Sequence, residues 1–192
     1  WGLRLKPQAY NRYGAGDNRA SFFFTAGHSV AVSSIGDFFS GIPAPKFSNR
    51  TSTGGQGSHP THVDTDFPVF RLADAQLMYA EAVARNGGGS RATALGYINA
   101  LRQRAYGNPS GNITDAQMTL DFILDERGRE LLWEGHRRTD LIRYGRFTGG
   151  SYLWSWKGGT QAGTSTEAFR DLYPLPANEL VANPNLKQNP GY

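Results

Sequence analysis

Three glutamates on one predicted helix are the first residues of this chain that could do chemistry. Glu126, Glu130 and Glu134 recur every four residues, and His136 follows closely, so the three carboxylates share one strip of the helix. They could line a metal site or act as a general acid and base. However, a di-metal site in a helical bundle takes a Glu-x-x-His motif from each of two helices. This stretch offers Glu-x-His instead.

Arginine is abundant in the same stretch, and this favours ion pairing over catalysis. Guanidinium groups are available nearby at Arg127, Arg129, Arg137, Arg138 and Arg143. A guanidinium and a carboxylate form strong, charge-assisted hydrogen bonds, and paired ions are the common fate of charges inside a helical bundle. We therefore predict no catalytic residue and a set of buried, structural ion pairs that includes Arg127, Glu130, Glu134, Arg138 and Asp140.

A second cluster of possible metal ligands lies in a predicted loop. The sequence SHPTHVDTD places four of them close together, at His59, His62, Asp64 and Asp66. Their spacing does not match the four-ligand pattern of a closed zinc site. The alternative is a polar lead-in to the helix that Pro68 would open. We predict no metal and no cofactor, with these four residues as the candidates if a cation does bind.

Composition excludes several other classes of function. The chain has 192 residues, no cysteine and a net charge of +4, so disulfides, thiolate zinc sites and cysteine nucleophiles are excluded. The basic residues are spread along the chain and interleaved with acids, which argues against nucleic-acid binding. No Gly-x-Ser-x-Gly elbow or phosphate-binding loop occurs. No apolar run approaches the ~20 residues that span a bilayer, and the start without Met suggests a fragment or a processed chain.

The spacing of apolar residues predicts helices in residues 67–147. Two stripes at helical spacing comprise Ala73, Leu77, Ala80 and Ala84, then Ala94, Ile98, Leu101 and Ala105. The glycine-rich residues 86–90 separate the two stripes, so they form a helical hairpin. A third helix is expected to begin near Thr119 as N-cap, or near Thr114 with Gln117 completing a capping box, and to run to about Glu134. A shorter helix should follow Gly135.

Residues 1–66 and 148–192 lack this periodicity. The first region is rich in Gly, Ser and aromatic residues, and its short apolar runs at 22–25 and 29–35 predict short strands or extended loops. The last region combines an aromatic loop with an extended, Pro-rich C-terminal strap, which must lie on a core that the helices supply. The predicted fold class is mostly α, with tetratricopeptide-like helical hairpins, long irregular loops and a few short strands.

Aromatic residues in the irregular regions are the candidates for ligand binding. Rings on loops are either structural plugs or flat surfaces on which a sugar ring can stack. They are Trp1, Tyr10, Tyr13, Phe38, Phe39, Tyr152, Trp154 and Trp156. We predict that Tyr10, Tyr13 and Phe39 bind ligand, and we rank Trp154 and Trp156 below them.

Four ordered stretches resemble the C-terminal part of the SusD/RagB family of outer-membrane nutrient-binding proteins. They are residues 67–82, 94–105, 123–147 and 173–192. The resemblance implies tetratricopeptide-like helix pairs, with regions 1–66, 67–147 and 148–192 belonging to one SusD-like domain whose N-terminal part is missing. It also implies a place on the cell surface in the outer membrane, through a lipid-bearing cysteine outside this fragment. The implied partner is a SusC-type TonB-dependent transporter.

The same resemblance implies a non-enzymatic function. The protein is expected to capture a glycan or oligosaccharide and deliver it to the transporter. A peptide-binding protein of the same architecture is the alternative. Similar Trp-Lys-Gly stretches precede the tail in relatives, which favours a structural or transporter-facing role for Trp154 and Trp156.

Overall fold

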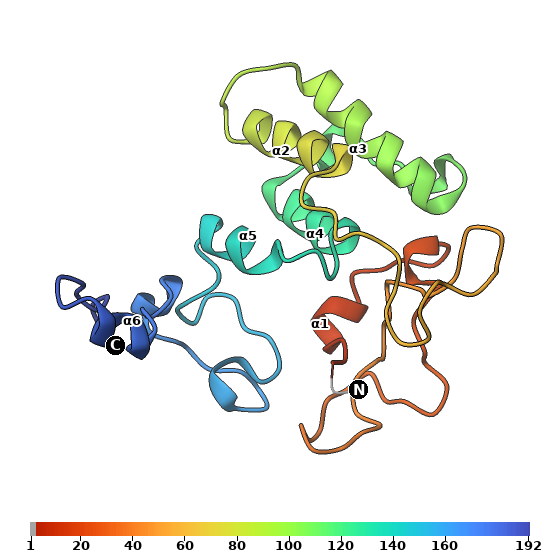
Figure 1. The fold of residues 1–192 in the computed structure, drawn as a ribbon. Coiled ribbons are helices and arrows are strands. Elements are labelled where there is room, and N and C mark those ends of the chain that lie inside the picture. The colour runs from red at the N-terminus through yellow and green to blue at the C-terminus, as the bar shows by residue number, and fades with distance from the viewer. Residues whose placement is uncertain (1–2) are drawn as a thin grey trace. The chain divides into compact units, whose positions relative to one another are not determined.

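The computed structural model describes residues 3–192, so Trp1, one of the aromatic candidates, lies outside the described residues. The regular secondary structure of the described chain is helical (Figure 1). Its β-structure consists of isolated bridges, such as the one between Leu5 and Ile42. The chain divides into two compact units, Trp1–Arg137 and Arg138–Tyr192.

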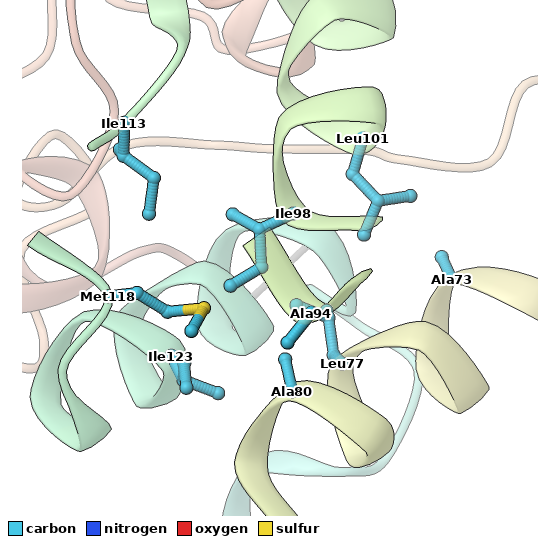
Figure 2. Packing of buried hydrophobic residues seen from close by; sticks show 9 residues of the cluster. All are labelled: Ala73, Leu77, Ala80, Ala94, Ile98, Leu101, Ile113, Met118 and Ile123. Atoms are coloured by element: carbon cyan, nitrogen blue, oxygen red, sulfur yellow. The ribbon is translucent and has the colours of Figure 1, made fainter. Parts of the chain in front are cut away.

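A helical hairpin organises the first unit. Helices α2 (Leu72–Ala84) and α3 (Arg91–Tyr106) pack against each other, and α4 (Leu120–Glu130) packs against α2 (Figure 1). Figure 2 shows the apolar cluster that these helices bury. Its members are Ala73, Leu77, Ala80, Ala94, Ile98, Leu101, Ile113, Met118 and Ile123. Both predicted stripes supply this core, and their alanines allow the two helices to approach closely.

Local sequence signals set most of the helix ends in this hairpin. The Ser90 hydroxyl accepts a hydrogen bond from the Thr93 amide at 3.2 Å and caps α3. Gly107 ends α3 with a left-handed backbone at φ 70°. Two short 3-10 turns, η2 (Pro109–Gly111) and η3 (Asp115–Gln117), then lead to Thr119, which caps α4 through the Phe122 amide.

Two predicted helix ends are wrong. The first helix begins at Leu72 rather than at Pro68, because Arg71 is extended, with φ −149°. The third ends at Glu130, four residues before Glu134. There Trp133 takes a left-handed backbone, with φ 62°, and its indole N–H donates to the Ala44 carbonyl at 2.7 Å. This contact to a distant segment outweighs the helical propensity of the sequence.

The irregular region before α2 has a small core of its own. It contains α1 (Pro7–Tyr10) and the 3-10 turn η1 (Asn18–Ala20). Its buried apolar residues are Leu5, Ile42 and Ala44. Aromatic side chains, Trp133 among them, pack around these three. The runs at 22–25 and 29–35 are loops rather than strands, and Ser29, in the second run, forms an isolated bridge to Ser40.

The second unit is mostly loop. Helix α5 (Arg137–Arg143) starts at the boundary, the 3-10 turns η4 (Lys157–Gly159) and η5 (Ala168–Asp171) follow, and α6 (Ala177–Ala182) lies in the tail. The tail folds back on itself, because the Gln188 side chain hydrogen-bonds both the amide and the carbonyl of Leu175. Within residues 3–192, no helix has both the length and the apolar character needed to cross a membrane.

The core of the hairpin should dominate the stability of the first unit. Leu77 has no exposed surface, whereas its neighbour Met78 is 49% exposed. Leu77→Ala should therefore lower the free energy of unfolding by about 2–5 kcal/mol. Met78→Ala, the matched control on the same helix, should change it by less than about 1 kcal/mol. Urea unfolding followed by circular dichroism measures both, and equal losses would contradict this description of the core.

Candidate functional site

The row of glutamates on α4 and in the turn after it lies inside the first unit and meets positive charges from several segments. Glu126 has no exposed surface. One of its oxygens accepts from Arg19 at 2.8 Å, and the other accepts from Arg102 and Arg129 at 2.7 Å each. The Glu126 carboxylate therefore joins η1, α3 and α4.

Glu130 and Glu134 continue the row. Glu130 accepts hydrogen bonds from Arg19 at 2.9 Å and from Arg71 at 2.8 Å, and it pairs with Arg104 on α3. Glu134 accepts from Arg71 at 2.6 Å and 2.9 Å, and from a lysine of the irregular region, Lys46. We call the ion pairs of Glu126, Glu130 and Glu134 the carboxylate row. Most of its cations come from outside the arginine-rich stretch where the sequence suggested them.

The other residues predicted to form ion pairs have separate partners. Arg127, on α4, is buried and lies 2.8 Å from Asp74 of α2. In the second unit, Asp140 is buried and accepts from Arg143 at 2.8 Å. Arg138 makes a different kind of contact. It donates to backbone carbonyls of η5 and lies over the ring of Tyr173, 3.8 Å from the centroid.

Partners decide the protonation state of these carboxylates. Burial alone would raise the pKa of Glu130, but hydrogen bonds from Arg71 and Arg104, with the charges of Arg104 and Arg19, lower it to about 2. The pKa values of Glu126 and Glu134 are lowered in the same way. A carboxylate that stays ionised and has both oxygens occupied is poorly suited to act as a general acid or base.

The row also lines a cavity of about 430 Å³. Arg71, Glu130 and Glu134 contribute to its wall, and so does Arg104, whose side chain is 58% exposed. The charged groups of this wall take part in the ion pairs described above. The cavity therefore lies within a structural network of paired charges, and we do not assign it as a ligand-binding site.

The candidate cation loop is exposed, and its side chains bond locally. The Nδ1 atoms of His59 and His62 lie 2.9 Å apart. Both oxygens of Asp64 accept hydrogen bonds from Ser58, which lowers the pKa of Asp64. Asp66 is exposed. Across the described residues, no three His, Asp or Glu side chains are grouped so that they could hold a metal ion.

The three predicted ligand-binding rings of the first unit differ in their surroundings. Tyr10 and Tyr13 pack beside Phe23, with ring centroids at 6.0 Å and 4.9 Å. The Tyr13 hydroxyl donates to the Arg129 carbonyl at 3.0 Å, and burial raises its pKa. Phe39, in contrast, is 62% exposed. Of the three rings, Phe39 offers the most surface to a ligand.

In the second unit, Trp154 and Trp156 line a cavity of about 650 Å³, which we call the aromatic hollow. Five rings contribute to its wall, those of Phe147, Trp154, Trp156, Tyr173 and Tyr192. Phe147 and Trp154 are stacked, with centroids 6.2 Å apart and planes 30° apart. Thr164, Ser165 and Thr166 also line it, together with charged residues that include Glu167 and Arg170.

Lys157 supports the aromatic hollow, and sequence reasoning missed it. Only 2% of its surface is exposed. Its ammonium group donates to the carbonyls of Gly149 and Tyr152 at 2.8 Å each and lies 4.7 Å from the centroid of the Trp154 ring. Burial lowers its pKa. A lysine between a tryptophan and two glycines gives no local signal of burial, because lysines in Gly-rich loops are normally exposed.

Comparison with known proteins identifies the family. The sequence profile of the SusD family matches residues 21–192. This match covers most of the chain, so the protein belongs to the SusD family. Members of this family are non-catalytic binding proteins.

Two relatives show how much of a family member is present. The starch-binding protein SusD of Bacteroides thetaiotaomicron is 42% identical over 183 residues, which are 93% of this chain and 31% of the relative. SusD-like protein P25 of Formosa agariphila is 37% identical over 124 residues, covering 63% of this chain and 23% of P25. The chain therefore spans about a third or less of these relatives.

Solved structures show the same fold. A SusD superfamily protein from Parabacteroides distasonis superimposes with a TM-score of 0.70 at 25% identity, over 99% of this chain and 42% of that protein. Another, from Bacteroides thetaiotaomicron, gives a TM-score of 0.64 at 25% identity, over 96% and 44% respectively. The surface glycan-binding protein A of Bacteroides uniformis, at 23% identity and a TM-score of 0.61, supports the fold alone.

Glu130 should be worth far more to stability than an exposed ion pair. Glu130→Gln keeps the shape of the side chain but leaves three arginines short of a partner, so it should cost about 3–5 kcal/mol. Asp115→Asn, the control, removes an ion pair whose aspartate side chain is 61% exposed, and it should cost less than about 1 kcal/mol. Urea unfolding of the three proteins measures the costs. Similar small losses in both variants would refute a structural role for Glu130.

The contribution of Glu130 should also depend on pH. Its pKa falls from 4.5 to about 2 on folding, so its stabilising effect is fully present above pH 4.5. Below that value the unfolded chain takes up the proton first, and the effect is lost as the pH falls through about 2. The stability difference between the wild type and Glu130→Gln should shrink over this window. A difference that stays constant down to pH about 2 would show that the charge is not responsible.

Proposed function

We propose that this protein captures a glycan at the cell surface and passes it to a TonB-dependent transporter of the SusC type in the outer membrane. One observation carries the proposal. The chain is 42% identical over 183 residues to a family member whose name states that it binds starch. Because the chain spans only 31% of that relative, the function is proposed for the whole protein to which this region belongs.

The architecture suits a protein that binds a glycan without catalysing a reaction on it. The packed hairpin of α2 and α3 provides a helical scaffold. The glutamates that could have served as acid and base are ionised and fully engaged. Rings on loops, Phe39 in the first unit and the aromatic hollow in the second, offer the flat apolar faces on which pyranose rings stack.

The proposed location and partner follow from the family. SusD-like proteins are typically lipoproteins of the cell surface and generally pair with SusC transporters. The anchor would lie outside the sequence described here. A capture protein that releases its cargo to a transporter needs only modest affinity. Several stacking contacts of about 0.5–1.5 kcal/mol each would give dissociation constants in the micromolar to millimolar range.

Isothermal titration calorimetry against two sets of ligands tests this proposal. One set consists of soluble oligosaccharides, with maltoheptaose as the starch-derived member, and the other is a mixture of peptides. We expect saturable binding of at least one oligosaccharide and none of the peptides. Saturable peptide binding without any sugar binding would instead establish the alternative, a peptide-capturing protein of the same architecture.

A further inference from the structure

The aromatic hollow has the size and lining of a binding site for a small ligand. Its volume of about 650 Å³ falls within the ~300–1,000 Å³ of typical ligand pockets. Five rings provide apolar faces, and the hydroxyl-bearing residues Thr164, Ser165 and Thr166 line the same cavity. Flat apolar faces beside hydroxyl groups are complementary to a pyranose ring, which has apolar C–H faces and an equatorial belt of hydroxyl groups.

Trp156 occupies this wall at an energetic cost. Its backbone is left-handed, with φ 67° and ψ 15°. That conformation is unfavourable for a bulky residue and favourable for glycine. Gly158 and Gly159, which follow closely, have φ values of 64° and 84°. The chain therefore has glycine at two left-handed positions of this turn and a tryptophan at the third. Strained backbone of this kind occurs at ligand-binding positions, and here it places Trp156 in the wall of the aromatic hollow.

Lys157 holds the neighbouring ring in place. Its ammonium group bridges the carbonyls of Gly149 and Tyr152, and it supports one side of the Trp154 ring. The backbone continues this bracing, since the Thr164 amide donates to the Lys157 carbonyl at 3.0 Å. Both arms of the loop are thus tied to Lys157, one through its ammonium group and the other through its backbone. A platform that is rigid before the ligand arrives loses less entropy when the ligand binds.

We propose that the aromatic hollow is a glycan subsite, in which sugar rings stack on Trp154 and Trp156 and hydrogen-bond to residues 164–166. This inference rests on the proposed function and deepens it by assigning a site. It also reverses the order expected from the sequence, because Tyr10 and Tyr13 are packed against Phe23.

Trp156→Gly is the variant that separates binding from folding. Glycine suits the left-handed backbone, and this offsets part of the packing that is lost with the half-buried ring, so a melting curve should show that the variant remains folded. Loss of one stacking ring should weaken maltoheptaose binding about 3- to 10-fold by isothermal titration calorimetry. Phe70→Ala is the matched control, since Phe70 is an aromatic residue that is 87% exposed and does not line the hollow. It should leave the affinity unchanged.

Indole N–H signals in NMR spectra test the site without any variant of uncertain stability. On addition of maltoheptaose, the signals of Trp154 and Trp156 should shift. The signal of Trp133, whose indole is bonded to Ala44 in the first unit, should not. Binding with unchanged affinity in Trp156→Gly, or with no shift at Trp154 and Trp156, would overturn the subsite and leave the proposed function standing. Failure of the wild type to bind any sugar would overturn both.

Discussion

The neutralisation of three buried carboxylates is the constraint on which the first unit depends. Glu126, Glu130 and Glu134 point one strip of negative charge into the protein, and a buried charge is tolerable only when it is paired. The cations that pair with these carboxylates include Arg19 of η1, Lys46, Arg71 just before α2, and Arg102 of α3. Segments far apart in the sequence must therefore meet at α4, and the row determines where they meet.

This constraint matters because the region before α2 has little else to fix it. Its described residues form isolated bridges rather than a sheet, and its buried apolar set consists of Leu5, Ile42 and Ala44. Two cations, Arg19 and Lys46, tie it to the carboxylate row. Trp133 adds a third tie through Ala44. An irregular region can thus be held in place by a few directional contacts to a helical scaffold.

The sequence predicted the helical hairpin well, because apolar spacing acts locally, and both stripes form the core as expected. It failed where contacts between residues distant in the sequence determine the structure. Nothing near Glu134 shows that Trp133 bonds to Ala44 and ends the helix early. A helical period identifies the face on which Glu130 lies, but not that Arg19 and Arg71 reach it. For the same reason, the residues next to Lys157 in the sequence did not indicate that it is buried.

The burial of Lys157 gives the loop around it an intrinsic chemical reporter. Amine reagents modify lysines that they can reach, and this ammonium is enclosed by backbone carbonyls and the Trp154 ring. Exposed lysines react at once, whereas Lys157 can react only while the loop is open. The rate at which Lys157 is acylated therefore reports how often the loop around it opens. Mass spectrometry would detect the acylation at this one residue, and no label or probe has to be attached to the protein beforehand.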